Sequence, residues 1–335
     1  MRLLVYEFIT GGGLTGAPLP STLLREGRMM RDALLADLSS LAEVSVSLSR
    51  DIRCRWPETA MPINRVEPRI SETAMAYFQR ALNEADLIWP IAPESGGALA
   101  RLASVARAAG KKVLLSDAAT LEICASKYQT AHVLGHAGIA VVPTYHSPAE
   151  AENPDGKWVS KPDDGSGGEG VRLWPNKDAA FQARMAESQH PMVFQPWFAG
   201  ESLSLSLLCS GGAARLLAIN RHATFWEKVG VTLTGITVNA YPRDAKDFQT
   251  LARRIAWALP GLRGYIGVDL IRSDEGALTV LEINPRLTTS YCGLRAALGV
   301  NVPQALLGQR CDDALPGLKF ISDRAVDVDL AAAYG

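Results

Sequence analysis

The segment 264–286 contains two acidic residues within strand-like stretches that are otherwise apolar, VDLI and LEIN. It reads as two strands joined by a tight turn at 274–277. A two-residue loop at 275–276 would place Asp269 directly opposite Glu282. Facing carboxylates in an apolar hairpin repel one another and are costly to bury, so this pattern needs a compensating cation.

The same hairpin supplies further polar groups on one face. Glu282, Asn284 and Arg286 are two residues apart, which places their side chains on the same side of a strand. Asp, Glu and an Asn carbonyl are suitable oxygen ligands for Mg²⁺. An ordinary exposed hairpin does not need its acids on a shared face, so we predict a metal site formed by Asp269, Glu282 and Asn284.

A second candidate is the stretch that follows Lys161, which has four glycines at 165–170 between two strand-like segments. Glycines let backbone N–H groups close around phosphate oxygens, while a nearby lysine supplies positive charge. No G-K-[ST] sequence opens a helix here, so this is not a Walker A loop. The alternative is an ordinary flexible hairpin loop.

Two other patterns, one of glycines and one of histidines, match known binding motifs only in part. Gly11, Gly13 and Gly16 have the spacing of a dinucleotide fingerprint, but prolines follow where its helix should begin, which favours a flexible loop at the carboxyl edge of a sheet. His132 and His136 have the spacing of a zinc pair, but the acid of the HExxH motif and a third ligand are missing. A surface or packed helix face is the better interpretation.

These residues need a scaffold, and hydrophobic periodicity indicates one. In the first 115 residues, LLVYEF, VSVSL, LIWPI and KVLLS read as strands, and they alternate with helices predicted at 22–41, 72–85 and 96–109. This alternation favours a doubly wound parallel sheet. After a helix at 119–137 and the strand-like AVVPTY, closely spaced strands predict antiparallel sheets, interrupted by helices at 177–189 and 245–259.

Composition narrows the class of protein. The chain has 34 Lys and Arg against 35 Asp and Glu, so we expect no nucleic-acid partner. It has no run of 18 apolar residues, and its first apolar run is too short for a signal peptide, so we expect no membrane partner. Five scattered cysteines fit reduced thiols and a cytoplasmic protein.

The order of the motifs resembles the ATP-grasp superfamily of carboxylate–amine ligases. The matching parts are the Ala-Ser-Lys of 125–127 before VVPTY, the glycine loop after Lys161, FQPWFAGE, and the VD…LEINPR hairpin. The resemblance implies an α/β and α+β protein. A doubly wound parallel-sheet domain at 1–116 would precede a two-subdomain ATP-grasp, with a lid subdomain at 117–192 and a metal-binding subdomain with antiparallel sheets at 193–335.

The resemblance also implies roles. Lys127 and Lys161 would contact phosphates under a glycine-rich lid, Glu201 would bind the ribose, and Arg286 would lie beside the transferring phosphoryl group with Lys161 as a second catalytic residue. Family members usually have Glu where this chain has Gln195. The implied ATP-binding residues are Lys127, Lys161, Gly165, Ser166, Gly167, Gly168, Gln195, Pro196, Trp197, Phe198 and Glu201, and the implied Mg²⁺ ligands are Asp269, Glu282 and Asn284. Mn²⁺ is an alternative metal.

The implied reaction phosphorylates a carboxylate with ATP and then forms an amide with an amine, so the partners would be a small-molecule acid and amine. YEF, the EGRMM of 26–30 and the NPRLTTS of 284–290 are most similar to the tyramine–glutamate ligases of methanofuran biosynthesis, which implies glutamate with tyramine or tyrosine. A dipeptide or D-alanine–D-alanine type of ligase, a carbamoyl-phosphate-like enzyme, a non-catalytic ATP-binding sensor, and a dinucleotide-dependent oxidoreductase remain alternatives. Whether the chain forms a homodimer is left open.

Overall fold

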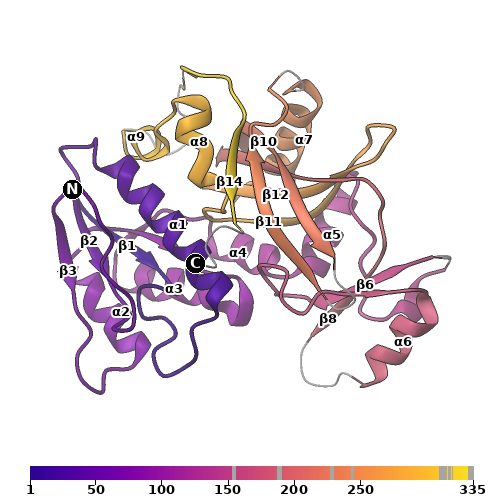
Figure 1. The fold of residues 1–335 in the computed structure, drawn as a ribbon, viewed down its shortest axis with the longest axis horizontal. Helices are drawn as coiled ribbons and strands as arrows, with labels where there is room; N and C mark the ends of the chain where they lie inside the picture. The colour runs from indigo at the N-terminus through magenta and orange to yellow at the C-terminus, as the bar shows by residue number, and fades with distance from the viewer. Residues whose placement is uncertain are drawn as a thin grey trace.

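The computed structural model describes residues 1–152, 156–186, 191–226, 230–242, 245–308, 315, 318 and 320–330. Within them the chain forms three sheets (Figure 1). A parallel sheet lies at the N-terminal end, a six-stranded antiparallel sheet forms the centre, and a three-stranded antiparallel sheet lies beyond it. This is the mixed α/β and α+β fold class predicted from the motifs.

The N-terminal sheet is parallel, with the strand order β3-β2-β1-β4-β5. Its strands are β1 (Arg2–Glu7), β2 (Ser45–Ser49), β3 (Ile63–Val66), β4 (Leu87–Ile91) and β5 (Lys112–Val113). Its helices are α1 (Ser21–Leu38), α2 (Ala74–Leu82) and α3 (Ala98–Ala108), with the short η1 (Ser95–Gly97) before α3.

Both faces of this sheet are covered, as β1 shows. Leu3 and Val5 belong to the same buried cluster as Leu34 of α1, whereas Leu4 and Tyr6 pack with the residues of α2 and α3. Successive side chains of a strand point to opposite faces, so a continuous apolar run needs helices on both sides. The predicted doubly wound arrangement is therefore confirmed.

The central sheet has the order β13-β12-β9-β10-β11-β14, and all its pairs are antiparallel. Its strands are β9 (Glu201–Ser210), β10 (Ala213–Trp226), β11 (Val231–Val238), β12 (Gly264–Arg272), β13 (Leu278–Asn284) and β14 (Val326–Asp329). Helix α7 (Ala245–Ala258) packs on one face through Phe248 and Ile255. Helices α8 (Tyr291–Leu298) and α9 (Val302–Leu307) follow β13 and contact α1.

The smallest sheet has the order β7-β6-β8 and is closed by a short helix. Its elements are β6 (Trp158–Pro162), β7 (Arg172–Trp174), β8 (Met192–Pro196), α6 (Lys177–Ala186) and the short η2 (Pro148–Glu150). Trp158 is fully buried and packs with Phe194 and Ala180. The last residues of the predicted helix 177–189, from 187 on, lie outside the described residues.

Two predictions about elements are wrong. The single helix expected at 119–137 is two helices, α4 (Ala118–Ala125) and α5 (Lys127–His136). Between them Ser126 is extended, with φ −109° and ψ 118°, and its side chain accepts a hydrogen bond from the Gln129 amide, as an N-cap does. The expected AVVPTY strand makes only isolated bridges, from Val141 to Val280 and from Tyr145 to Phe194.

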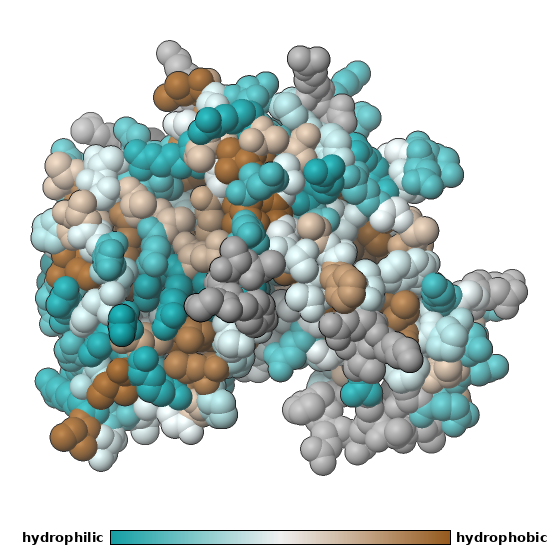
Figure 2. Space-filling view, viewed as in Figure 1, coloured by the Kyte–Doolittle hydropathy of each residue, from teal (hydrophilic) through white to brown (hydrophobic). Residues whose placement is uncertain are grey.

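The three sheets follow one another along the chain, but the domain bounds 1–116, 117–192 and 193–335 remain a prediction. Figure 2 shows hydrophilic residues over much of the visible face, with smaller hydrophobic groups between them. Each helix in the described part of the chain is too short or too polar to cross a bilayer. Cys54, Cys124, Cys209 and Cys292 are free thiols, whereas Cys311 lies outside the described residues.

Candidate active site

The hairpin of β12 and β13 brings the two acids together, because Asp269 and Glu282 are directly opposed in the register. The turn and the pairing that bring the acids together differ from the predicted two-residue loop. The strands end at Arg272 and Leu278, so the connection at 273–277 is longer than two residues. The pairing then shifts by one residue after Asp269, where β13 has an extra residue, Leu281. The longer turn and the bulge offset each other.

Burial and neighbouring charges determine the protonation state of this acid pair. Burial and the charge of Glu282 raise the pKa of Asp269 well above its usual range, while the Asn284 Nδ2 donates to Asp269 Oδ2 at 3.1 Å. Burial also acts to raise the pKa of Glu282, but Lys127 and Lys161 lower it to about 2. One acid is therefore held as the anion, and its charge makes ionisation of the other unfavourable.

The cations beside the acids come from two different elements. Lys127 is the first residue of α5, and its Nζ lies 3.4 Å from Glu282 Oε2 and donates to the carbonyl groups of Asp163 and Gly165. Lys161 lies on β6 and is buried. Burial lowers the pKa of Lys161 to about 8 against the attraction of Glu282. The break at Ser126 starts a new helix at Lys127, next to the acids.

The glycine-rich loop at 165–170 is folded against the N-terminal domain. Gly167, Gly168 and Gly170 have φ values of 65°, 75° and 71°, which only glycine adopts readily. The Ser166 hydroxyl lies 3.2 Å from the hydroxyl of Ser95, and the Gly96 amide donates to Asp164 at 2.7 Å. The loop therefore bridges the parallel sheet's domain and the three-stranded sheet.

These groups surround one cavity of about 740 Å³, within the size range of small-molecule sites. Most of the predicted site residues line it: Lys127, Lys161, Gly165, Gly167, Gly168, Gln195, Pro196, Trp197, Phe198, Glu201, Asp269 and Glu282. Asn284 does not line the cavity, but its side chain donates to Asp269. Ser166 and Arg286 line a smaller cavity of about 50 Å³ beside the large one.

Part of the lining of the large cavity is apolar. Gln195 of β8 is buried, and its side-chain amide donates to Thr144 Oγ1 at 2.8 Å. Trp197 packs edge-on against Trp226, with ring centroids 4.8 Å apart. Val159 adds an aliphatic side chain to the wall. A planar aromatic group would bury its faces between such side chains.

Glu201 has two partners that the sequence patterns do not indicate. The Tyr241 hydroxyl donates to Glu201 Oε1, and Arg272 bonds Oε2 at 2.7 Å. The Arg272 guanidinium also lies over the Tyr241 ring, 4.2 Å from its centroid. The carboxylate, which lines the cavity, is thus held in one orientation.

Arg286 is partly buried beside the small cavity, where it forms a bidentate ion pair. Its Nε and Nη2 each lie 2.9 Å from an oxygen of Glu94, and Nη1 donates to the Leu287 carbonyl. Glu94 comes from the N-terminal domain, directly before η1. The partner of Arg286 could not be predicted from the hairpin, because 192 residues separate the two.

A row of polar side chains beneath the acids was also missed. His222 Nε2 lies 2.9 Å from Ser204 Oγ, and Asn220 donates to Ser206 Oγ at 3.0 Å. Burial lowers the pKa of His222 to about 4, so its ring is neutral near pH 7. The alternation of serine and leucine in LSLSLLC could have revealed a polar strand face here.

The two weaker patterns lie outside the large cavity. Helix α1 starts at Ser21, beyond Gly11, Gly13 and Gly16, as the prolines predict. Their loop has a regular hydrogen-bonded structure, with the Gly11 amide donating to the Glu7 carbonyl at 2.7 Å. The rings of His132 and His136 lie 4.2 Å apart, and in the described part of the chain no three His, Cys, Asp or Glu side chains gather around a potential metal position.

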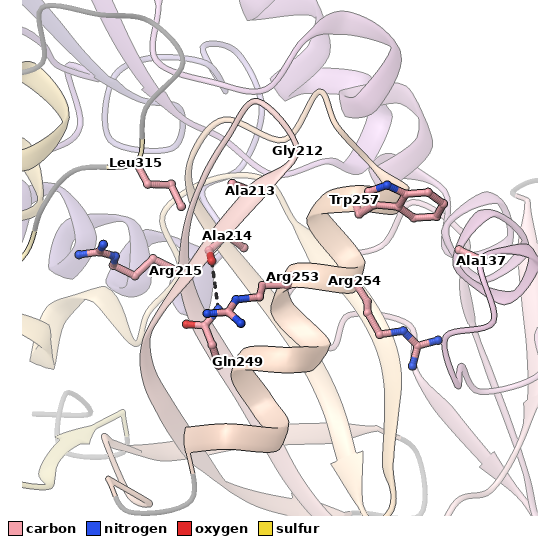
Figure 3. A pocket seen from close by; sticks show the side chains of 10 residues that line it. All are labelled: Ala137, Gly212, Ala213, Ala214, Arg215, Gln249, Arg253, Arg254, Trp257 and Leu315. Atoms are coloured by element: carbon pink, nitrogen blue, oxygen red, sulfur yellow. Dashed lines mark hydrogen bonds between the residues drawn. The ribbon is translucent and has the colours of Figure 1, made fainter.

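A separate groove of about 640 Å³ lies at the start of β10 and along α7, away from the acids (Figure 3). Arg215, Arg253 and Arg254 border it with the exposed Trp257. Gln249 in its wall donates to the Ala214 carbonyl at 3.0 Å. None of the predicted site residues lines this groove.

Comparison with known families agrees with this architecture. Residues 124–290 match the ATP-grasp domain family, and residues 44–121 match the family described as the pre ATP-grasp 3 domain. The two matches are adjacent, and the ATP-grasp match includes every predicted site residue. The chain belongs to the ATP-grasp superfamily. It is an ATP-binding enzyme of the carboxylate–amine ligase kind.

The individual relatives and solved structures have low sequence identity to this chain. The tyramine–L-glutamate ligase of Methanocaldococcus jannaschii is 25% identical over 295 residues, covering 88% of this chain and 84% of that protein. An ATP-grasp superfamily protein from Archaeoglobus fulgidus has the same fold, with a TM-score of 0.72 at 21% identity over 98% of this chain and 92% of that one. The biotin carboxylase domain of Hydrogenobacter thermophilus 2-oxoglutarate carboxylase, solved with MgADP, has a TM-score of 0.67 at 14% identity, covering 94% and 71%.

Proposed function

We propose that this enzyme uses Mg-ATP to phosphorylate the carboxylate of glutamate and joins the resulting acyl phosphate to the amine of tyramine or tyrosine. The observation that carries the proposal is the partly buried pair Asp269 and Glu282, which lies with Lys127 and Lys161 in one cavity that also has an apolar lining. The relatives named tyramine–L-glutamate ligase support the choice of substrates.

The residues fit Mg²⁺. Mg²⁺ in nucleotide sites is usually held by one or two carboxylates and the phosphates, so the absence of a third acid among the described residues agrees with it. Asp269 and Glu282 would hold the ion, and the Asn284 amide oxygen would be the third protein ligand. The bound ion would offset the phosphate charge. Mn²⁺ accepts similar oxygen ligands.

The side chains of the chain itself would position the reactants. Lys127 and Lys161 would contact the phosphates, under the loop that contains Gly165, Ser166, Gly167 and Gly168. Residues 195–198 would hold the adenine, and Glu201 would accept from the ribose hydroxyls. Positioning and charge stabilisation can supply most of the rate enhancement for such a phosphoryl transfer.

Arg286 would act at the boundary of the two cavities. Its ion pair with Glu94 leaves the guanidinium charge in place and fixes its orientation. A phosphoryl oxygen in the large cavity would be attracted by that positive charge. Closure of the glycine loop would keep water from the acyl phosphate.

The test is ADP formation by the purified protein with Mg-ATP, glutamate and tyramine, followed by mass spectrometry of the product. We expect ADP, phosphate and the glutamyl amide of tyramine in equal amounts, and no ADP when either substrate is omitted or Mg²⁺ is chelated. Other acid and amine pairs are run in parallel. Tight ATP binding with no ADP from any pair would favour a sensor and contradict the proposal.

A further inference from the structure

The small cavity of about 50 Å³ beside the large one is lined by both charged and apolar side chains. It lies between α1, the end of β4 and the glycine loop, and its apolar wall includes Ile9, Leu23, Met30 and Ile91. Glu26 of α1 lines both this cavity and the large one, as Gly167 does. The two spaces therefore meet at Glu26.

Glu26 is the one carboxylate bordering the small cavity that still has room for a ligand. Its Oε2 accepts from Thr289 Oγ1 at 2.8 Å, while its Oε1 accepts no hydrogen bond and Glu26 has no ion pair among the described residues. Glu7 also lines the cavity, but its two oxygens accept from the amides of Ile9 and Thr10 at 3.1 and 2.6 Å.

The remaining charges make this site negative. Arg286 is the only cation among the described residues lining the small cavity, and its positive charge is shared with Glu94 in a bidentate pair. A second acid, such as the side-chain carboxylate of glutamate, would be repelled by Glu26. A ligand with a positive charge at one end and an uncharged carbon skeleton matches both Glu26 and the apolar wall.

We propose that Glu26 binds the ammonium group of the amine substrate, with the carbon skeleton against the apolar wall of the small cavity. The inference rests on the proposed function. In the present arrangement the cavity holds only a few atoms. Ser166 and Gly167 form one wall, so movement of the glycine loop would enlarge it, and the meeting point at Glu26 places the nitrogen next to the large cavity where the carboxylate is activated.

Glu26→Gln tests the charge and keeps the shape, because a glutamine oxygen can still accept from Thr289. We expect the KM for tyramine to rise about 10- to 100-fold, the loss expected for one hydrogen-bonded charge. Hydroxylamine is uncharged near pH 7.5 and traps the acyl phosphate as glutamyl hydroxamate, with release of phosphate. Its rate should stay within about threefold of wild type.

The matched control is Asp32→Asn. It removes a negative charge from the same helix, but Asp32 is exposed and pairs with Arg31 away from both cavities. Its KM for tyramine should not change. An unchanged KM for tyramine in Glu26→Gln would overturn the proposal, and so would an equal loss of hydroxamate, since Glu26 would then serve the acid or the fold.

Calorimetric binding of tyramine to the ATP-bound enzyme separates this inference from the proposed function. If the wild type releases no ADP with any acid, the proposed reaction fails. The placement of Glu26 is still supported if tyramine binds the wild type and binds Glu26→Gln at least tenfold more weakly, and it is overturned if both bind equally.

Discussion

Replacing Glu282 by glutamine is the most direct test of the acid pair. The change keeps the size of the side chain and removes one charge. It removes the one carboxylate of the pair that Lys127 and Lys161 hold as the anion. Removal of one preorganised charged contact at the reacting group typically lowers kcat about 10²- to 10³-fold. We expect a loss of at least about 100-fold.

The effect on folding should be smaller. Breaking a fully buried ion pair costs about 3–5 kcal/mol, but the Glu282 side chain is 23% exposed to the cavity and its pair with Lys127 is 3.4 Å long. We therefore expect a loss of about 1–3 kcal/mol in the free energy of unfolding. A typical domain has 5–15 kcal/mol, so the variant should remain folded.

The assay is steady-state ADP release with glutamate and tyramine, together with calorimetric binding of ADP at several Mg²⁺ concentrations. Glu275→Gln is the control, because it makes the same change in the exposed turn of the same hairpin and should keep kcat within about twofold. A Glu282→Gln enzyme with the wild-type kcat and the wild-type Mg²⁺ dependence would refute the metal assignment.

Three further outcomes can be checked. In Gly168→Ala, φ of +75° and a Cβ 3.0 Å from the Val231 carbonyl strain the loop, so the KM for ATP should rise about 5- to 30-fold with little change in Tm. Trp197→Ala should weaken ADP binding about 3- to 10-fold by calorimetry, because the apolar wall loses an aromatic face. Hydrogen bonds from Arg80 lower the pKa of Glu72 to about 2 from 4.5, so its stabilisation is present above pH 4.5 and lost toward pH 2. In urea unfolding, the free energy of unfolding should fall less between pH 6 and pH 3 for Glu72→Gln than for the wild type. The two decreases should differ by under about 1 kcal/mol.

Local patterns were sufficient for the elements that bury regular apolar faces. The strands β1, β2 and β4 and the helix α1 follow from runs and periods within the segment itself. The edge strand β3 was missed because its INRV sequence has only two apolar residues, and its position depends on pairing with β2.

The break between α4 and α5 could not be predicted, because a distant residue causes it. The residues around Ser126 are compatible with one continuous helix. Asp163 is 37 residues away, yet it accepts from the Ser126 hydroxyl at 2.7 Å and from the Tyr128 amide at 2.9 Å. Those bonds stabilise a new N-terminus at Lys127, since they satisfy groups that a helix end leaves unpaired. A tertiary contact thus overrides local propensity.

The acid pair shows why a correct prediction can have a wrong local basis. Asp269 does face Glu282, although the connection is longer than the expected two-residue turn. A slip of one residue would turn Glu282 away from Asp269 and expose Ile283, which is buried. The extra residue Leu281 absorbs the longer turn and restores the register. The pairing of the acids is therefore specified by which side chains must be buried and which must face the cavity. The length of the turn does not determine it.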